Sequence, residues 1–257
     1  RVGEYAEPLL MVNLTRENYP EIYEEYFYRL HGKYPPEMPS FNETLGALRK
    51  LVEESATLKC MNVLEEGDLF LLDGALRGDG YGFMQSMIEK AVNKSISIAS
   101  VSKATSLLWK GGANLSAVVR SRGDNLHRNK SWYAKVGSVG QDQNKSWLGD
   151  IYIARLNPYS DLTFRIDLSR SNSKKPSEVF SGLSELATDP FFLGYPYPLA
   201  AIHQMVRLSE DELYGFMIRL QDIALGKGVD QSRWDLLFAD YHRVLNFDLR
   251  ETYLRRM

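Results

Sequence analysis

Two short apolar runs in the first half of the chain each end in a charged side chain suited to phosphate chemistry. The run from 68 to 72 ends at Asp73, and the run from 95 to 101 is followed by Lys103. Apolar runs of this length, bounded by turn residues, are typical of buried strands. Ligands of open α/β sheets collect at the carboxyl ends of strands, which makes Asp73 a candidate site residue. The alternative is a simple turn at the Asp-Gly pair.

A helical pattern over residues 83–92 separates the two runs. A strand, a helix and a second strand in this order predict a βαβ-like unit. Both strands of such a unit end at the same side of the sheet. We therefore expect Asp73 and Lys103 to be neighbours.

A second candidate group lies near the C-terminal part, where Tyr195 and His203 are eight residues apart. Pro198 suits the first turn of a helix, because its missing N–H would have no helical partner there. Tyr195 lies in the proline-flanked segment before that helix, and His203 about one turn inside it. The phenol and the imidazole could act at one place, although a single histidine on a half-apolar helix is more often structural.

A basic segment with interleaved aromatic residues runs from 101 to 135, and Asp124 is its one acidic residue. We assign six of its cations to a nucleic-acid path: Lys103, Lys110, Arg120, Arg122, Arg128 and Lys130. Cations mixed with aromatic rings suit a surface that follows phosphates and stacks on bases. A solvated loop is the alternative, and we expect residues 111–129 to form a loop or lid.

Hydrophobic periodicity predicts an α/β fold with a helical C-terminal part. Strands are expected at 9–14, 68–72, 95–101, 131–137, 150–156 and 162–168, the last three antiparallel. Helices are expected at 19–30, 43–60, 83–92, 177–187, 198–206, 209–225 and 232–246. In the last strand, Phe164 and Ile166 should face one side of the sheet, and Arg165 and Asp167 the other.

The composition is that of a globular protein without a membrane span. The 257 residues carry a net charge of -2, and 44% of them are apolar. No apolar run approaches the roughly 20 residues that a membrane span requires, and no signal peptide is apparent, so we expect a cytoplasmic location. The single Cys60 excludes an internal disulfide framework and argues against a cysteine-based zinc site.

Four stretches together resemble the NurA family of DNA nucleases. They are Leu72-Asp-Gly-Ala-Leu76, Ala99-Ser-Val-Ser-Lys103, Phe164-Arg-Ile-Asp167, and Gly194-Tyr-Pro-Tyr-Pro-Leu199 followed by His203. Their order matches from about residue 43 to 246, and the last stretch is the most specific. The resemblance implies a single nuclease domain over residues 1–257, with a ribonuclease-H-like mixed sheet flanked by helices.

The resemblance also implies an activity and partners. The implied enzyme is a Mn²⁺-dependent deoxyribonuclease, with Mg²⁺ as the alternative ion, that acts as a 5′–3′ exonuclease and single-strand endonuclease. It would process single- and double-stranded DNA in end resection and double-strand break repair by homologous recombination, as a homodimer with a HerA-type hexameric translocase. Segment 19–28 contains five aromatic residues, too many for one helical stripe, so we expect one set to pack inward and another to contribute to the dimer interface.

Residue by residue, the resemblance makes Asp73, His203 and Glu53 metal ligands, with Glu54 as the alternative glutamate. Carboxylates suit hard divalent ions, and Mn²⁺ also accepts histidine. Asp167 could supply a further carboxylate, unless its place in the alternating strand merely reflects solvent exposure.

Lys103 and Tyr195 complete the implied catalytic set, with Lys103 neutralising phosphate charge and Tyr195 donating to a phosphate oxygen or orienting water. Ala75 stands where the family motif usually has serine. The family's first aspartate, on an N-terminal strand, has no counterpart after Arg1, so we expect that strand to lie upstream or to be lost.

Two other classes of function compete with the nuclease. A catalytically impaired relative could bind DNA or serve as a scaffold subunit of a translocase complex. A nucleotide or sugar-phosphate enzyme is less well supported, because the chain has no Gly-x-Gly-x-x-Gly or P-loop lysine pattern.

Overall fold

The computed structural model describes residues 14–78, 80–138, 147–206 and 209–238. The chain divides into two compact units, Arg1–Gln204 and Met205–Met257. The region of family resemblance, 43–246, extends over both units, and a single nuclease domain spanning them stays a prediction. Residues 9–13 of the predicted strand at 9–14 and the predicted helical residues after 238 lie outside the described residues.

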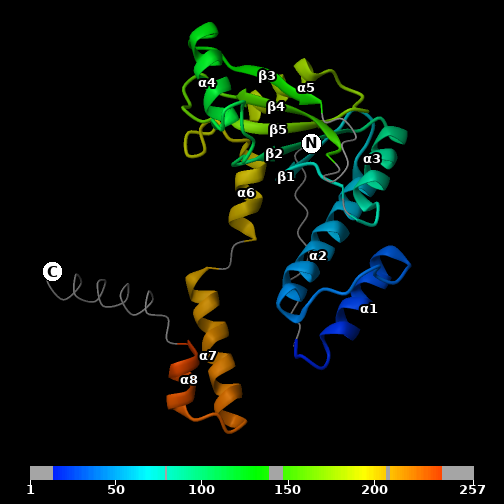
Figure 1. Cartoon of the computed structure of the whole chain (residues 1–257), viewed down its shortest axis with the longest axis vertical. Coiled ribbons are helices and arrows are strands. Elements are labelled where there is room, and N and C mark those ends of the chain that lie inside the picture. Colours follow the sequence, from blue (N-terminus) through cyan, green and yellow to red (C-terminus); the bar gives the residue numbers. More distant parts are fainter. Residues whose placement is uncertain (1–13, 79, 139–146, 207–208, 239–257) are drawn as a thin grey trace, which may run out of the picture. The chain divides into compact units, whose positions relative to one another are not determined.

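A mixed sheet forms the centre of the first unit (Figure 1). In the described residues its strands are β1 (Leu69–Asp73), β2 (Ser97–Ser102), β3 (Trp132–Ser138), β4 (Gly149–Arg155) and β5 (Phe164–Ser169). Their spatial order is β1-β2-β5-β4-β3. β1 and β2 are parallel, and the other neighbouring strands are antiparallel. The α/β class, the βαβ-like unit and the three antiparallel strands are thus confirmed.

Helices flank this sheet and make up the described part of the second unit. Those of the first unit are α1 (Tyr19–His31), α2 (Phe41–Val63), α3 (Phe83–Asn93), α4 (Leu115–Leu126), α5 (Pro176–Leu186) and α6 (Tyr197–Met205). The second unit contains α7 (Glu210–Gly226) and α8 (Gln231–Phe238). A capping box begins α7, because the Ser209 hydroxyl accepts the Glu212 N–H while the Glu212 carboxylate accepts the Ser209 N–H. None of the described helices is long and apolar enough to cross a bilayer.

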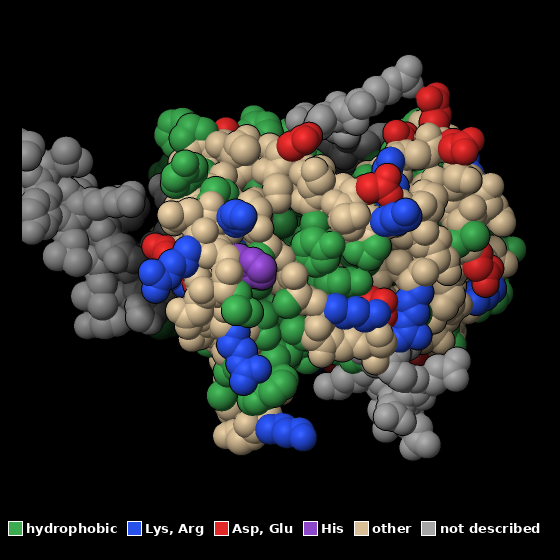
Figure 2. Space-filling model, turned by 90° about the horizontal axis from the view of Figure 1, so that it is seen from above, with side chains coloured by type: hydrophobic (Ala, Val, Ile, Leu, Met, Phe, Trp, Pro, Cys, Tyr) green, Lys and Arg blue, Asp and Glu red, His purple; other side chains and the backbone are tan. Residues whose placement is uncertain are grey.

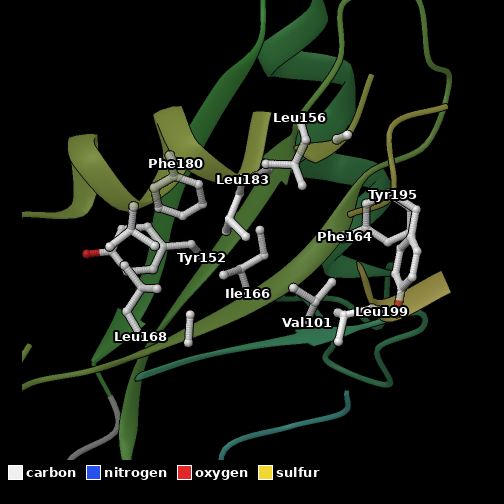
Figure 3. Close-up of a cluster of buried hydrophobic side chains, with 14 of the residues drawn as sticks. Val101, Tyr152, Leu156, Phe164, Ile166, Leu168, Phe180, Leu183, Tyr195 and Leu199 are labelled. Carbon is white, nitrogen blue, oxygen red and sulfur yellow. The ribbon is translucent and has the colours of Figure 1, made fainter. Parts of the chain in front are cut away.

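Both faces of the sheet are buried along its inner strands β2, β5 and β4. On one face Val101, Ile166 and Leu168 pack against α5 and α6 through residues such as Leu183 and Leu199 (Figure 3). On the other face a second cluster joins the sheet to α2 and α3. Alternate side chains of β5 therefore point into two buried layers, one on each face of the sheet, rather than into a core and solvent.

Along β5, Arg165 and Asp167 face the other side of the sheet from Phe164 and Ile166, as predicted. However, Arg165 and Asp167 are only 4% and 1% exposed. The interpretation of Asp167 as a solvent-exposed strand position is wrong, since helices and the connection after β1 cover that face.

The expected loop or lid at 111–129 instead contains the helix α4. Its first turn is capped by Asn114, whose side-chain oxygen accepts the N–H of Ala117 at 3.1 Å. Near its end, Asp124 accepts the Trp132 indole N–H at 3.1 Å and pairs with Arg155 at 3.0 Å. The glycines at 111 and 112 suggested a loop, whereas these contacts with β3 and β4 hold a helix in place.

The aromatic residues of α1 are divided between an inner and an outer surface. Tyr23 and Phe27 are buried in a cluster with Leu48 and Leu51 of α2. Tyr28 is 50% exposed. The inward-facing set is confirmed, and the dimer interface proposed for the outer set stays a prediction.

Substitution of Gly123 tests the packing of α4 against the sheet. A Cβ atom at Gly123 would lie 2.5 Å from the Trp132 ring, whereas one at Gly46 in α2 would meet nothing within 4 Å. Gly123→Ala should therefore lower the free energy of unfolding by about 1–2 kcal/mol, because overpacking exceeds the gain in helix propensity. Gly46→Ala should raise it by about 0.5–1 kcal/mol. Denaturant titration measures both values, and a stabilising Gly123→Ala would contradict this packing.

Candidate functional site

The parallel pairing of β1 and β2 brings Asp73 and Lys103 together, as predicted. Asp73 is in register with Val101, so Lys103 lies just beyond the same end of the sheet. The Lys103 Nζ is 2.8 Å from Asp73 Oδ2. Both side chains are 45% exposed, which leaves the pair accessible to a ligand.

Tyr195 joins this pair from the segment that precedes α6. Its hydroxyl donates a long hydrogen bond, 3.4 Å, to Asp73 Oδ1. Its ring packs edge-on against Phe164 at 5.2 Å between centroids (Figure 3). The Lys103 Nζ lies 5.7 Å from the centre of the same ring. Three segments far apart in the sequence thus meet at one sheet edge.

The chain before Tyr195 requires a glycine at position 194. Gly194 has a φ of +89°, which side-chain-bearing residues rarely adopt. A Cβ there would also lie 2.3 Å from the Ser160 hydroxyl oxygen. With Gly194 packed closely against Ser160, the Tyr195 ring lies in the core and its hydroxyl reaches Asp73.

The environment of Tyr195 keeps its phenol protonated. Burial raises the pKa of Tyr195 well above the ordinary value, and the nearby Asp73 carboxylate adds to the increase through its charge and the hydrogen bond. Asp73 is consequently faced by two donors, an ammonium and a neutral phenol. Such a set can bind a phosphate oxygen or orient a water molecule beside the carboxylate.

The two candidate glutamates of α2 have different surroundings. Glu54 is buried and accepts a hydrogen bond of 2.7 Å from the Tyr81 hydroxyl. Its other oxygen lies 3.1 Å from the His31 Nε2. Glu53 is exposed and lies 3.5 Å from Arg49. The contacts of Glu54 tie α1, α2 and the segment before α3 together.

The third candidate ligand, His203, has an exposed side chain on α6. Within the part of the chain that the structure describes, no three His, Cys, Asp or Glu side chains are grouped to hold a metal ion. The expected ligands Asp73, Glu53 or Glu54, and His203 are therefore not assembled among these residues. A single carboxylate beside a lysine does not by itself fit a divalent ion, and metal binding stays a prediction.

Asp167 is held in a buried ion pair with Arg165, and its role as a further metal ligand stays a prediction. Its two oxygens accept hydrogen bonds from Arg165 at 2.7 and 2.8 Å. One of them also accepts the backbone N–H of Leu76 at 3.0 Å. The alternation of β5 could have indicated this partner, because Arg165 and Asp167 are two residues apart and share a face.

The cations assigned to a DNA path are not equivalent. Lys110, Arg122, Arg128 and Lys130 are exposed. Arg120 lies 3.4 Å from Asp124 and 3.1 Å from Asp161, so its charge is partly neutralised. On the face seen in Figure 2, Lys and Arg side chains are dispersed among polar and hydrophobic groups rather than joined in one patch. The DNA path stays a prediction.

Sequence reasoning missed Arg77, an exposed cation four residues after Asp73. Its guanidinium lies 4.2 Å from the centre of the Trp147 ring. Arg165 lies over the same ring at 4.0 Å. No local pattern pointed to this arrangement, since Trp147 is seventy residues further along the chain.

Comparison of the chain with protein-family models, with curated proteins and with solved structures found no match in any of the three.

The raised pKa of Tyr195 predicts a specific effect of alkaline pH on stability. The folded state favours the protonated phenol, so this contribution is complete below the unfolded-state pKa of about 10 and is lost as the pH rises above it. Tyr195→Phe should make the melting temperature fall less steeply between pH 9 and 11. Thermal unfolding of both proteins measures this, and the contribution of every other tyrosine cancels in the comparison. If the melting temperatures of the two proteins fell equally steeply with pH, this would contradict a buried Tyr195 phenol that is hydrogen-bonded to Asp73.

Proposed function

We propose that this chain is a DNA nuclease whose active site lies at the carboxyl ends of β1 and β2. The observation that carries the proposal is the meeting of Asp73, Lys103 and Tyr195. Each belongs to a different stretch of the NurA-like resemblance, and Tyr195 is 122 residues from Asp73 in sequence. A half-exposed carboxylate beside an ammonium and a protonated phenol is suited to phosphodiester hydrolysis.

Each of the three side chains has a role in this proposal. The Asp73 carboxylate accepts hydrogen bonds and can orient an attacking water. The Lys103 ammonium can compensate charge that develops on the phosphate in the transition state. The Tyr195 phenol stays protonated and can donate to a phosphate oxygen. The Mn²⁺ or Mg²⁺ requirement belongs to the same proposal and rests on the family resemblance.

The finer activity and the partners rest on that resemblance as well. They comprise 5′–3′ exonuclease and single-strand endonuclease activity, DNA end resection and repair, homodimerisation and cooperation with a HerA-type translocase.

A second candidate function is a DNA-binding or scaffold subunit that does not cut. The pairing of Glu54 with His31 and Tyr81 favours it, because one of the two glutamates that the resemblance offers as a metal ligand is engaged within the protein. The pairing of Asp167 with Arg165 also favours the scaffold, because it engages a second candidate carboxylate within the protein.

Asp73→Asn separates the two candidates. The substitution removes a charge from a half-exposed position, so the fold should persist while cleavage falls at least a hundredfold. Cleavage of labelled single- and double-stranded DNA is measured with Mn²⁺, with Mg²⁺ and with excess EDTA, beside DNA binding. Glu66→Gln, which removes an exposed carboxylate before β1, is the matched control and should cleave normally.

Undiminished cleavage by Asp73→Asn would reject this active site, and undiminished cleavage in EDTA would reject the metal requirement. DNA binding by a wild-type protein that cuts nothing under any condition would favour the scaffold.

The exposed cations predict a graded salt dependence of DNA binding. Arg122→Ser combined with Arg128→Ser should reduce the slope of log K against log salt by about two units, since each phosphate contact contributes roughly 0.9. Arg120→Ser should change the slope by less, because Asp124 and Asp161 already face that guanidinium. Fluorescence anisotropy at several salt concentrations gives the slopes. An unchanged slope for the double variant would assign these arginines to ordinary surface.

A further inference from the structure

The buried pair of Arg165 and Asp167 lies next to the chain segment that follows Asp73. Asp167 accepts two hydrogen bonds from the Arg165 guanidinium and one from the backbone N–H of Leu76. Leu76 and Asp167 are 91 positions apart. A side chain from an inner strand of the sheet therefore holds the backbone of the connection that leaves β1.

Leu76 is fixed on its other sides as well. Its carbonyl accepts the N–H of Leu148 at 3.2 Å, and its side chain is fully buried. The next residue, Arg77, pairs with Trp147 through an antiparallel β-bridge, and the guanidinium groups of Arg77 and Arg165 both lie over the Trp147 ring. Both backbone polar groups of Leu76 thus have partners.

Asp73 and Leu76 are joined by two small residues, Gly74 and Ala75. Gly74 has a φ of +109°, and its N–H donates to the carbonyl of Val101 at 2.8 Å. Because glycine adopts many backbone conformations, the direction of the chain after Asp73 depends on where the next anchor lies. That anchor is Leu76, held by Asp167.

We infer that Asp167 is a positioning residue of the site. It fixes Leu76, and through Leu76 it sets the direction in which Asp73 meets Lys103 and a DNA phosphate. Arg165 compensates the buried carboxylate through two hydrogen bonds, and within this ion pair the bond from the Leu76 N–H is charge-assisted. The effect on cleavage rests on the proposed function, whereas the effect on the backbone does not.

Two double variants isolate the Leu76 hydrogen bond from the ion pair. Arg165→Met with Asp167→Asn removes both charges but keeps an acceptor oxygen for the Leu76 N–H. Arg165→Met with Asp167→Leu removes the charges and the acceptor. Replacement of a buried ion pair by uncharged groups of similar size often preserves a fold, and cooperative thermal unfolding identifies variants that can be compared.

Hydrogen exchange of the Leu76 amide, followed by nuclear magnetic resonance, is the first measurement. Exchange should be roughly tenfold or more faster in the Asp167→Leu double variant than in the Asp167→Asn double variant. The carboxyl ¹³C resonance of Asp73, which senses its contact with Lys103, should move in the former and stay near the wild-type position in the latter. Equal exchange rates or an unmoved Asp73 resonance would overturn the inference, whether or not the protein cuts DNA.

Steady-state cleavage is the second measurement. In the Asp167→Leu double variant kcat should fall at least tenfold while KM for DNA changes less than about twofold, because a misdirected carboxylate affects the chemical step more than binding. The Asp167→Asn double variant should retain most of kcat. Equal kcat values in the two variants of a protein that cleaves DNA would overturn the link to catalysis, whereas no cleavage by the wild type would reject the proposed function alone.

Discussion

The parallel pairing of β1 with β2 is the constraint on which the site depends. It aligns Asp73 with Val101, so the two strands end together and Lys103 reaches the Asp73 carboxylate at 2.8 Å. Parallel strands need a crossover, which α3 supplies while covering one face of the sheet. The other face is covered by α5 and α6, and the segment before α6 brings Tyr195 to the same edge. The core and the site are therefore built by the same packing.

Burial on both faces explains how polar groups are used within the sheet. Charged side chains inside a protein need partners, and Asp167 obtains them from Arg165 and from the Leu76 backbone. Asp73, at the open end of β1, keeps a half-exposed carboxylate. Two aspartates of one sheet thus have separate roles, since one organises the backbone and the other remains available to a ligand.

Much of the fold followed from local patterns, because strand length, capping residues and apolar periodicity are local properties. The βαβ-like unit and its consequence, the contact of Asp73 with Lys103, were predicted for this reason. Contacts between distant segments were not predictable in the same way. The helix α4 depends on Asp124 meeting β3 and β4, and the Arg77–Trp147–Arg165 stack joins residues with no common motif. Whether Glu53 or Glu54 is buried likewise depended on the docking of α1.

The proposed function requires that Asp73, Lys103 and Tyr195 act as one site on a DNA phosphate. A double-mutant cycle in single-turnover cleavage tests it most directly, with Lys103→Ala, Tyr195→Phe and the combination of both. If the side chains act on one phosphate through Asp73, each single change lowers the cleavage rate and the combined loss differs clearly from the sum of the two free-energy changes. Strictly additive losses, or full activity of the combined variant, would contradict the account.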